Sequence, residues 1–159
     1  MSQLGAWGTA LAFESSSNRL LTPCEIGVEG SARYAQHDVV GLPPFYEFIG
    51  PGLSTCQLTV RLSAREGVSP RAQLDLLRAA RDEGVAAVLV IGGRPVFDAG
   101  HLAVLEKIGE AWAYFTGQGG LLVAVGELTF HEVVPREHYT VAANAIGSGA
   151  ATKRNVVSK

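Results

Sequence analysis

The sequence predicts an α+β fold, namely an antiparallel β-sandwich or split barrel with one main helix, at about residues 69–84, on its flank. Two segments lead to this prediction. From Cys56 to Leu62 apolar and polar residues alternate, which is the period of a strand with one buried and one solvated face. From Ser69 to Gly84 the leucines instead follow a helical spacing.

The composition indicates one hydrophobic core and a surface with few charges. A chain of 159 residues is long enough for one domain, and only 18% of its residues are charged. Such a surface is either partly covered by neighbouring subunits or belongs to a rather apolar monomer. The net charge is −2 and no Lys/Arg run occurs, which argues against direct nucleic-acid binding. No apolar run reaches the roughly 18 residues of a membrane span, so we expect no membrane partner.

The first forty-six residues are expected to contain two strands and an irregular loop. Residues 4–13 are apolar on both alternating faces, which predicts a strand buried on both sides or covered by another subunit. A short strand is expected within residues 20–30. Between Ser31 and Tyr46, one glycine and two prolines make a long regular element improbable. The aromatic residues of this loop either fold back on the core or press against a partner.

The middle of the chain carries the clearest helix signals. Gly50-Pro51-Gly52 predicts a turn before the alternating strand. Ser69 suits the N-cap and Pro70 the first helical position. Leu74 and Leu77 would face the sheet, and Gly84 would let the chain leave in a left-handed conformation.

The remaining segments up to residue 135 favour further strands, roughly six to eight in all. We expect them at 85–91, around 95–97, and at 102–108, 111–115 and 121–132, with glycine turns at 92–93 and 117–120. Residues 1–135 therefore form one predicted domain. Residues 136–159 are rich in small side chains and predict an extended C-terminal arm or a disordered tail.

No pattern typical of catalysis or metal binding occurs, so we expect no enzyme activity, no catalytic residue, no cofactor and no metal. The histidines form no HxH or HExxH pair. No nucleophile motif or paired-acid pattern is present. The glycine-rich segments lie between expected strands, which favours hairpin turns over phosphate loops. The residues considered were His37, His101, His131, His138, Asp38, Asp98 and Glu106.

Two cysteines, Cys24 and Cys56, lack the CxxC spacing of a zinc or redox site. Residues 1–5 lack the basic and apolar regions of a signal peptide. We therefore expect the protein to be made and kept in a reducing cytoplasm, with both thiols free.

The order of these features resembles the phage tail protein U (GpU) family of contractile-tailed phages, over about residues 4–133. The residues that carry the resemblance are Leu4-Gly5, Phe13, the Phe48-Ile49-Gly50-Pro51 segment, the CQLTVRL strand, Leu74 and Leu77, Gly84, Gly100, the LEKIGEAWAYFTGQGG segment and Leu128-Thr129-Phe130. The chain departs from the family in two places. SARYAQHDVVG keeps only loosely the family's Arg/Trp-bearing stretch, and Leu121 directly follows Gly119-Gly120 where many members have a Pro-Arg pair.

The resemblance implies a tail-tube or baseplate-like fold and a place in the virion. It implies a non-enzymatic structural subunit at the baseplate centre of a contractile tail, or of a tail-like injection particle. Such a subunit would link the tube and hub axis to surrounding baseplate subunits. The implied partners are a hub protein, a LysM-type tail protein, tube or sheath-proximal subunits, and further copies in a symmetric ring.

Two alternatives remain. The first is a tail-terminator or tube-completion protein near the neck. The second, from another class, is a small-ligand-binding β-barrel, which would need an enclosed pocket with convergent polar groups.

We predict that the subunit interface combines aromatic residues of the domain with residues of the C-terminal arm. Core packing is the ordinary outcome for both tryptophans, Trp7 and Trp112. Trp7 has the better claim to an interface, because a strand near a terminus can be an edge. The predicted interface residues are Trp7, Phe13, Tyr34, Phe45, Tyr46, Tyr139, Ile146, Lys153 and Arg154.

Truncation of the chain after Pro135 tests the predicted division at that residue. We expect the melting temperature of the free protein to stay unchanged, because residues 136–159 supply few core-forming side chains. We expect particle assembly to fall, because an arm of this composition can become ordered on a neighbouring subunit. A large drop in melting temperature would assign the segment to the domain core, and unchanged assembly would contradict docking.

Overall fold

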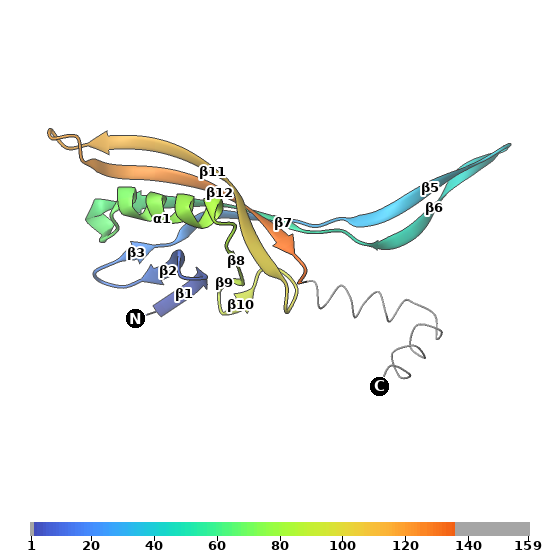
Figure 1. Ribbon diagram of the computed structural model, residues 1–159, viewed down its shortest axis with the longest axis horizontal. Helices are drawn as coiled ribbons and strands as arrows, with labels where there is room; N and C mark the ends of the chain where they lie inside the picture. The colour runs from blue at the N-terminus through green and yellow to red at the C-terminus, as the bar shows by residue number, and fades with distance from the viewer. Residues whose placement is uncertain (1, 136–159) are drawn as a thin grey trace.

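The computed structural model describes residues 2–135, which form mostly antiparallel β-structure with one α-helix. The largest sheet curls into a half-barrel, so the predicted α+β split barrel is confirmed. Figure 1 shows the helix and a smaller sheet on the same side of the large sheet. The predicted C-terminal arm, residues 136–159, lies outside the described residues.

The described strands form three sheets. The large sheet has the order β4 (Pro23–Glu29), β7 (Thr55–Ser63), β12 (Leu121–Val133), β11 (Leu102–Phe115) and β8 (Ala86–Ala87). The small sheet has the order β10 (Arg94–Pro95), β9 (Leu89–Ile91), β1 (Ser2–Trp7), β2 (Leu11–Ser15) and β3 (Leu20–Leu21). The third is a two-stranded hairpin of β5 (Ala32–Val39) and β6 (Leu42–Pro51), which we call the ribbon.

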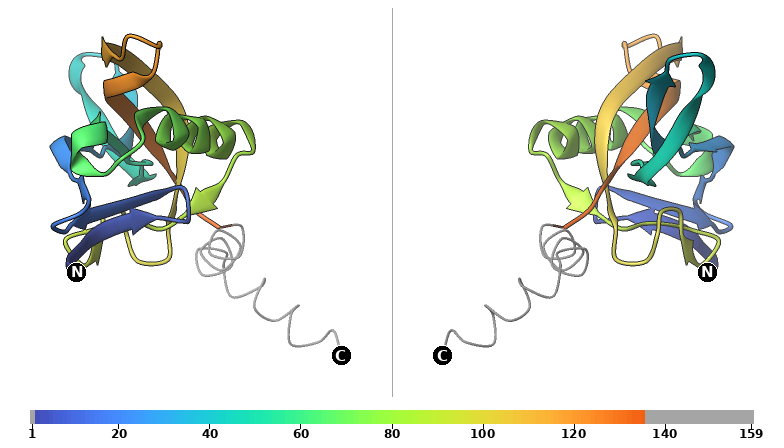
Figure 2. Two further views of the ribbon diagram at one scale, coloured as in Figure 1. Left: turned by 90° about the vertical axis from the view of Figure 1, so that its left-hand side faces the viewer. Right: turned by 90° about the vertical axis from the view of Figure 1, so that its right-hand side faces the viewer.

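The helix α1 (Pro70–Asp82) begins and ends where the sequence predicts. It is preceded by the 3₁₀ turn η1 (Ala64–Glu66). Ser69 precedes it in an extended conformation, although its side chain makes no capping hydrogen bond. Gly84 follows it at φ 67°, in the left-handed region that favours glycine. Leu74 and Leu77 are fully buried, and α1 packs against β11, β12 and β7. Figure 2 shows the helix lying between the two sheets.

The small sheet is tied to the large one by Trp7. Its ring packs edge-on against Phe130 of β12, with ring centroids 5.0 Å apart. Its Nε1–H donates a hydrogen bond to the Ala103 carbonyl of β11 over 2.9 Å. The polar edge of this buried indole is thus satisfied while its large apolar body fills the space between the sheets.

Two predicted strands are divided in the structure. Residues 4–13 form a hairpin, because β1 ends at Trp7 and the chain turns through Gly8 at φ 54°. Residues 85–91 are divided at Val88, because β8 pairs with β11 of the large sheet while β9 pairs with β1 of the small sheet. Conversely, the two strands expected at 102–108 and 111–115 are one strand, β11, with irregularities in its register.

The prediction of an irregular loop between Ser31 and Tyr46 is wrong, because this segment forms the ribbon. Pro43 and Pro44 are tolerated in β6 because, within the described chain, this strand has a partner on one side only. The prediction of a turn at Gly50-Pro51-Gly52 is also wrong, since β6 runs through Pro51. The Gly52 N–H donates to the Ser31 carbonyl over 2.7 Å, and a Cβ at Gly52 would lie 2.6 Å from that oxygen.

Leu77→Ala tests how much the buried face of α1 contributes to stability. We expect the free energy of unfolding to fall by about 2–5 kcal/mol, because the substitution leaves a cavity at a fully buried site. The matched control is Leu76→Ala on the same helix, where the side chain is 54% exposed and the expected change is below about 0.5 kcal/mol. Urea unfolding measures both, and equal losses would contradict the assignment of faces.

Candidate interaction surface

The ribbon is the part of the described chain that projects furthest from the body. The pair β4–β7 belongs to the large sheet, and beyond it the chain continues outward as β5 and β6 (Figure 1). The main contacts of the ribbon are those between its own two strands. An isolated two-stranded hairpin is marginally stable in water, so a projecting ribbon needs either internal side-chain contacts or a partner.

One face of the ribbon carries a cluster of aromatic rings. Tyr34 packs edge-on against Phe48 across the strands, with centroids 5.5 Å apart, and against Tyr46 at 6.4 Å. Tyr46 donates a hydrogen bond from its hydroxyl to Gln36 over 3.2 Å. The three rings nevertheless stay between 56% and 66% exposed.

The other face of the ribbon carries a stacked pair. The His37 ring lies over the Phe45 ring with centroids 5.0 Å apart. His37 Nε2 lies 2.9 Å from a Glu47 carboxylate oxygen on the opposite strand. Phe45 stays 54% exposed. Aromatic side chains are thus exposed on both faces, a surface of the kind that marks protein–protein contact sites.

The base of the ribbon is held by Glu132, which is 3% exposed. One carboxylate oxygen accepts a hydrogen bond from the Ser54 N–H over 2.7 Å, and the Glu132 N–H donates to the Ser54 carbonyl over 2.9 Å. The other carboxylate oxygen contacts His101 Nδ1. Burial alone would raise the pKa of Glu132, but the hydrogen bonds from His101 and Ser54 outweigh it and hold the pKa below its ordinary value.

Glu132 also belongs to a three-residue group whose composition suits a cation. Ligand atoms of Asp98, His101 and Glu132 lie within 4.8 Å of one another. Both Glu132 oxygens are already engaged by the protein, however. The hydrogen bonds that join the strands account for this arrangement, and we assign no metal to it.

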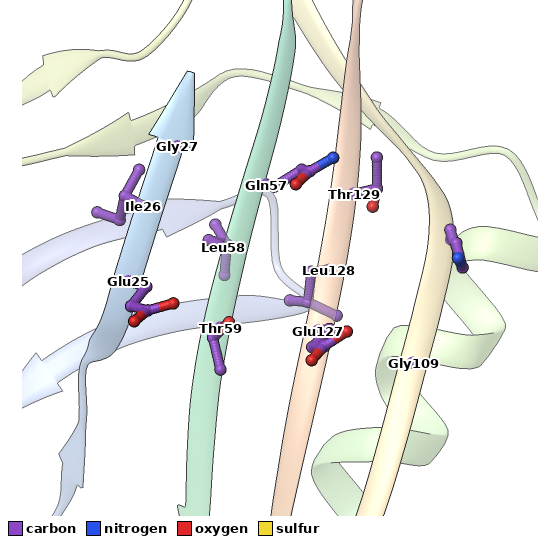
Figure 3. A pocket seen from close by; sticks show the side chains of 11 residues that line it. Glu25, Ile26, Gly27, Gln57, Leu58, Thr59, Gly109, Glu127, Leu128 and Thr129 are labelled. Carbon is purple, nitrogen blue, oxygen red and sulfur yellow. The ribbon is translucent and has the colours of Figure 1, made fainter. Parts of the chain in front are cut away.

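The face of the large sheet remote from α1 is polar and hollowed. Alternate residues of β7 and β12 point to it, and a hollow of about 720 Å³ lies there (Figure 3). Its lining includes Glu25, Gln57, Thr59, Lys107, Glu127 and Thr129. Small-molecule pockets are mostly apolar, so this lining is more typical of a solvated sheet face than of a ligand site.

A second exposed aromatic group lies at the end of the molecule opposite the ribbon, where β11 and β12 turn back (Figure 1). Trp112 is 41% exposed, with the Arg71 guanidinium 4.8 Å from its ring centroid. Arg78 of α1 donates two hydrogen bonds to Glu110 of β11, one of them over 2.7 Å. These hydrogen bonds from Arg78 lower the pKa of Glu110 and fix the helix to the strand.

The two cysteines form no disulfide with each other and differ in environment. Cys24 is exposed. Cys56 lies fully buried on the inner face of β7, and burial raises the pKa of its thiol to about 11. The Cys56 thiol therefore stays protonated and unreactive at neutral pH.

The structure corrects the predicted interface in one part and leaves it open in the others. Trp7 and Phe13 are fully buried in the core, so the folded body cannot offer them to a partner. Tyr34, Phe45 and Tyr46 are exposed on the ribbon rather than folded back on the core. The remaining predicted residues lie outside the described chain, namely Tyr139, Ile146, Lys153 and Arg154.

Sequence reasoning missed three features of this surface. Trp112 was expected in the core and is half exposed at the end of β11. Asp98 showed no acidic neighbour in the sequence, yet the fold brings it to Glu132. Phe48 could have been grouped with the other ribbon aromatics. Tyr34 and Phe48 lie on either side of Gly41, at the positions that a hairpin turning at this glycine would pair.

The family model described as Phage P2 GpU matches residues 13–134. A search of the curated proteins found no match. Within residues 2–135, no helix has the length and apolar character needed to cross a membrane.

Glu132→Gln tests the hydrogen-bonded base of the ribbon. We expect the free energy of unfolding at neutral pH to fall by about 1–3 kcal/mol, because the buried partners lose a charged acceptor. The charged Glu132 contributes its full share of the free energy of unfolding at pH values above its ordinary pKa of 4.5. That share is lost as the pH falls through the lower pKa of the folded state. The variant should therefore show a smaller loss of stability on acidification than the native chain.

The matched control is Glu127→Gln, on the exposed face of the neighbouring part of β12. We expect it to change the free energy of unfolding by less than about 0.5 kcal/mol at any pH. Urea unfolding between neutral and acidic pH measures both variants. If Glu132→Gln behaved like the control, the carboxylate would not hold the ribbon base.

Proposed function

The chain belongs to the Phage P2 GpU family of phage tail structural proteins, and from this premise we propose that it is a non-enzymatic subunit at the baseplate centre of a contractile tail or tail-like injection particle. In this role it links the tube and hub axis to the surrounding baseplate subunits. Its partners are a hub protein, a LysM-type tail protein, tube or sheath-proximal subunits, and further copies of itself in a symmetric ring.

The observation that carries the proposal is the exposed ribbon. It extends beyond the body and exposes aromatic rings on both faces. In a free protein these rings would stay in contact with water, which is unfavourable in proportion to their apolar area. In an assembled tail a neighbouring subunit covers them. The ribbon therefore suits a protein whose working state is an assembly.

The pairing of the described histidines supports a structural role over an enzymatic one. His101 contacts Glu132, His131 contacts Glu106, and His37 contacts Glu47. The last two contacts join neighbouring strands, β11 with β12 and β5 with β6, and the first joins β12 to the residue preceding β11. These groups hold the sheets together, which is a sufficient account of their positions.

The proposal includes a division of the chain into a domain and an arm. Residues 1–135 form the folded domain of the subunit, and the C-terminal arm, residues 136–159, docks on an adjacent subunit. Family resemblance supports the baseplate position. Imaging of particles labelled with an antibody to this protein tests it: label at the tail tip fits the baseplate, whereas label at the neck would replace it with a tail-terminator role.

The triple variant Tyr34→Ser, Tyr46→Ser and Phe48→Ser tests the ribbon as the assembly surface. We expect tail particles to fail to assemble, because the aromatic surface that the neighbouring subunit would contact is lost. We expect the melting temperature of the free protein to change little, because the three rings lie outside the buried core.

The matched control is Leu76→Ser, which removes a similarly exposed apolar side chain from α1. Particles should assemble normally with this variant. Normal particle yield from the triple ribbon variant, measured by electron microscopy and infectivity or injection activity, would contradict the proposed role of the ribbon.

A further inference from the structure

Among the long strands of the described chain, β4, β5, β6 and part of β11 each have one edge without a strand partner. Strand β5 pairs only with β6. Strand β11 pairs along its length with β12, but on its other side β8 covers only Ala103 and Val104. From Glu106 to Phe115 the outer edge of β11 therefore offers unpaired backbone groups, and so does the outer edge of β5. Such edges are templates for pairing with another chain.

The other long strand edges are protected against pairing. Strand β6 contains Pro43, Pro44 and Pro51, which lack the N–H that a ladder requires. Edge strand β4 begins with Pro23 and carries Glu25 and Glu29. Charges and prolines on an edge discourage strand addition. By contrast, β5 and the free part of β11 contain no proline, and each carries charges of both signs that can meet opposite charges on a partner strand.

We propose that β5 of one copy adds as an antiparallel strand to the free edge of β11 in a second copy, with Asp38 opposite Lys107. The inference rests on the proposed function, since it names the partner of the ribbon within the assembly. It is a β-augmentation, in which backbone hydrogen bonds hold the strands and side-chain pairs select the register.

Charge selects the antiparallel direction. Along β5, Arg33 lies near the beginning and Asp38 near the end, whereas along the free part of β11 Lys107 precedes Glu110. Antiparallel pairing brings Asp38 to Lys107 and Arg33 toward Glu110. Parallel pairing with the two strands in line would instead bring Arg33 toward Lys107. Opposite charges across strands stabilise a pair and like charges destabilise it.

The existing ion pairs select the register. Neither Asp38 nor Lys107 forms an ion pair within residues 2–135, so each charge is available to a partner. Glu110, by contrast, is already engaged by Arg78. Placing Asp38 directly opposite Lys107 therefore joins two available charges, and it leaves Arg33 diagonal to Glu110.

The same register matches large side chains with small ones. It places Tyr34 opposite Ala111 and Gln36 opposite Gly109, on the face that also carries Asp38 and Lys107. The two small β11 residues leave room for the ring cluster of the ribbon, which rises on this face. Pairing of bulky with small residues across strands lets the two surfaces fit closely.

A second copy is the partner because one chain carries both halves of the contact. The ribbon projects at one end of the long axis, and the free part of β11 runs toward the other end (Figure 1). A contact between two different surfaces of identical subunits is heterologous, so it repeats from copy to copy and closes into a ring when the rotation allows. This is the geometry that a tail subunit around a central axis requires.

Disulfide cross-linking between two singly substituted copies tests the pairing. Asp38→Cys and Lys107→Cys are placed on separate chains, both with Cys24→Ser, and the chains are co-assembled into tail particles. Cys56 stays unreactive because it is buried with its thiol pKa raised to about 11. Directly opposite residues of antiparallel strands have Cα atoms about 4.5–5.5 Å apart, which a disulfide can span.

We expect a covalent dimer on non-reducing gels of oxidised particles that contain both chains. The matched control replaces Lys107→Cys with Glu25→Cys on the protected β4 edge, and we expect no dimer from it. Absence of the dimer, or equal dimer from the control, would overturn the pairing. That result would leave the proposed function standing if the triple ribbon variant still failed to assemble.

Exchange of the two charges gives a second test that needs no cysteine. Asp38→Lys and Lys107→Asp should each lower particle yield about fivefold, because each places like charges opposite one another. The double variant should restore the yield, since the charges are again opposite. A double variant no better than the single ones, with all chains folded by circular dichroism, would overturn the proposed register.

Discussion

Glu132 joins the base of the ribbon to the large sheet, and the exposed aromatic rings extend outward from that base. Its carboxylate and its backbone both bond Ser54, at the point where the chain enters the large sheet from the ribbon. The carboxylate is buried, so it costs free energy unless its partners stay in place. This requirement fixes where β7 begins, and therefore where the ribbon leaves the sheet. A partner then meets a ribbon whose base is already positioned, which lowers the entropic cost of association.

The structure divides its aromatic residues between two purposes. Trp7 and Phe130 bury their rings and tie the sheets together. The ribbon rings and Trp112 stay half exposed at opposite ends of the molecule. A body with a fully packed centre can stay folded alone, while exposed rings at its ends add stability only when subunits meet. This division fits a family of tail proteins whose members work as parts of an assembly.

Local patterns were predictable from sequence, and long-range ones were not. The alternation around Cys56 and the helix at Leu74 and Leu77 depend on neighbouring residues, so both predictions are confirmed. Whether Trp7 or Trp112 is buried depends on which sheet covers it, so the sequence assigned exposure to the wrong tryptophan. The prolines of β6 argued against a strand, but a ribbon tolerates them because one edge lacks a partner within the described chain.

In the proposed assembly, a neighbouring subunit pairs with the ribbon. Amide hydrogen exchange along the outer edge of β5 reports on this pairing, because those N–H groups have no strand partner within residues 2–135. We expect fast exchange in the free protein and strong protection in assembled particles. Equal exchange rates in the free and assembled states would contradict it.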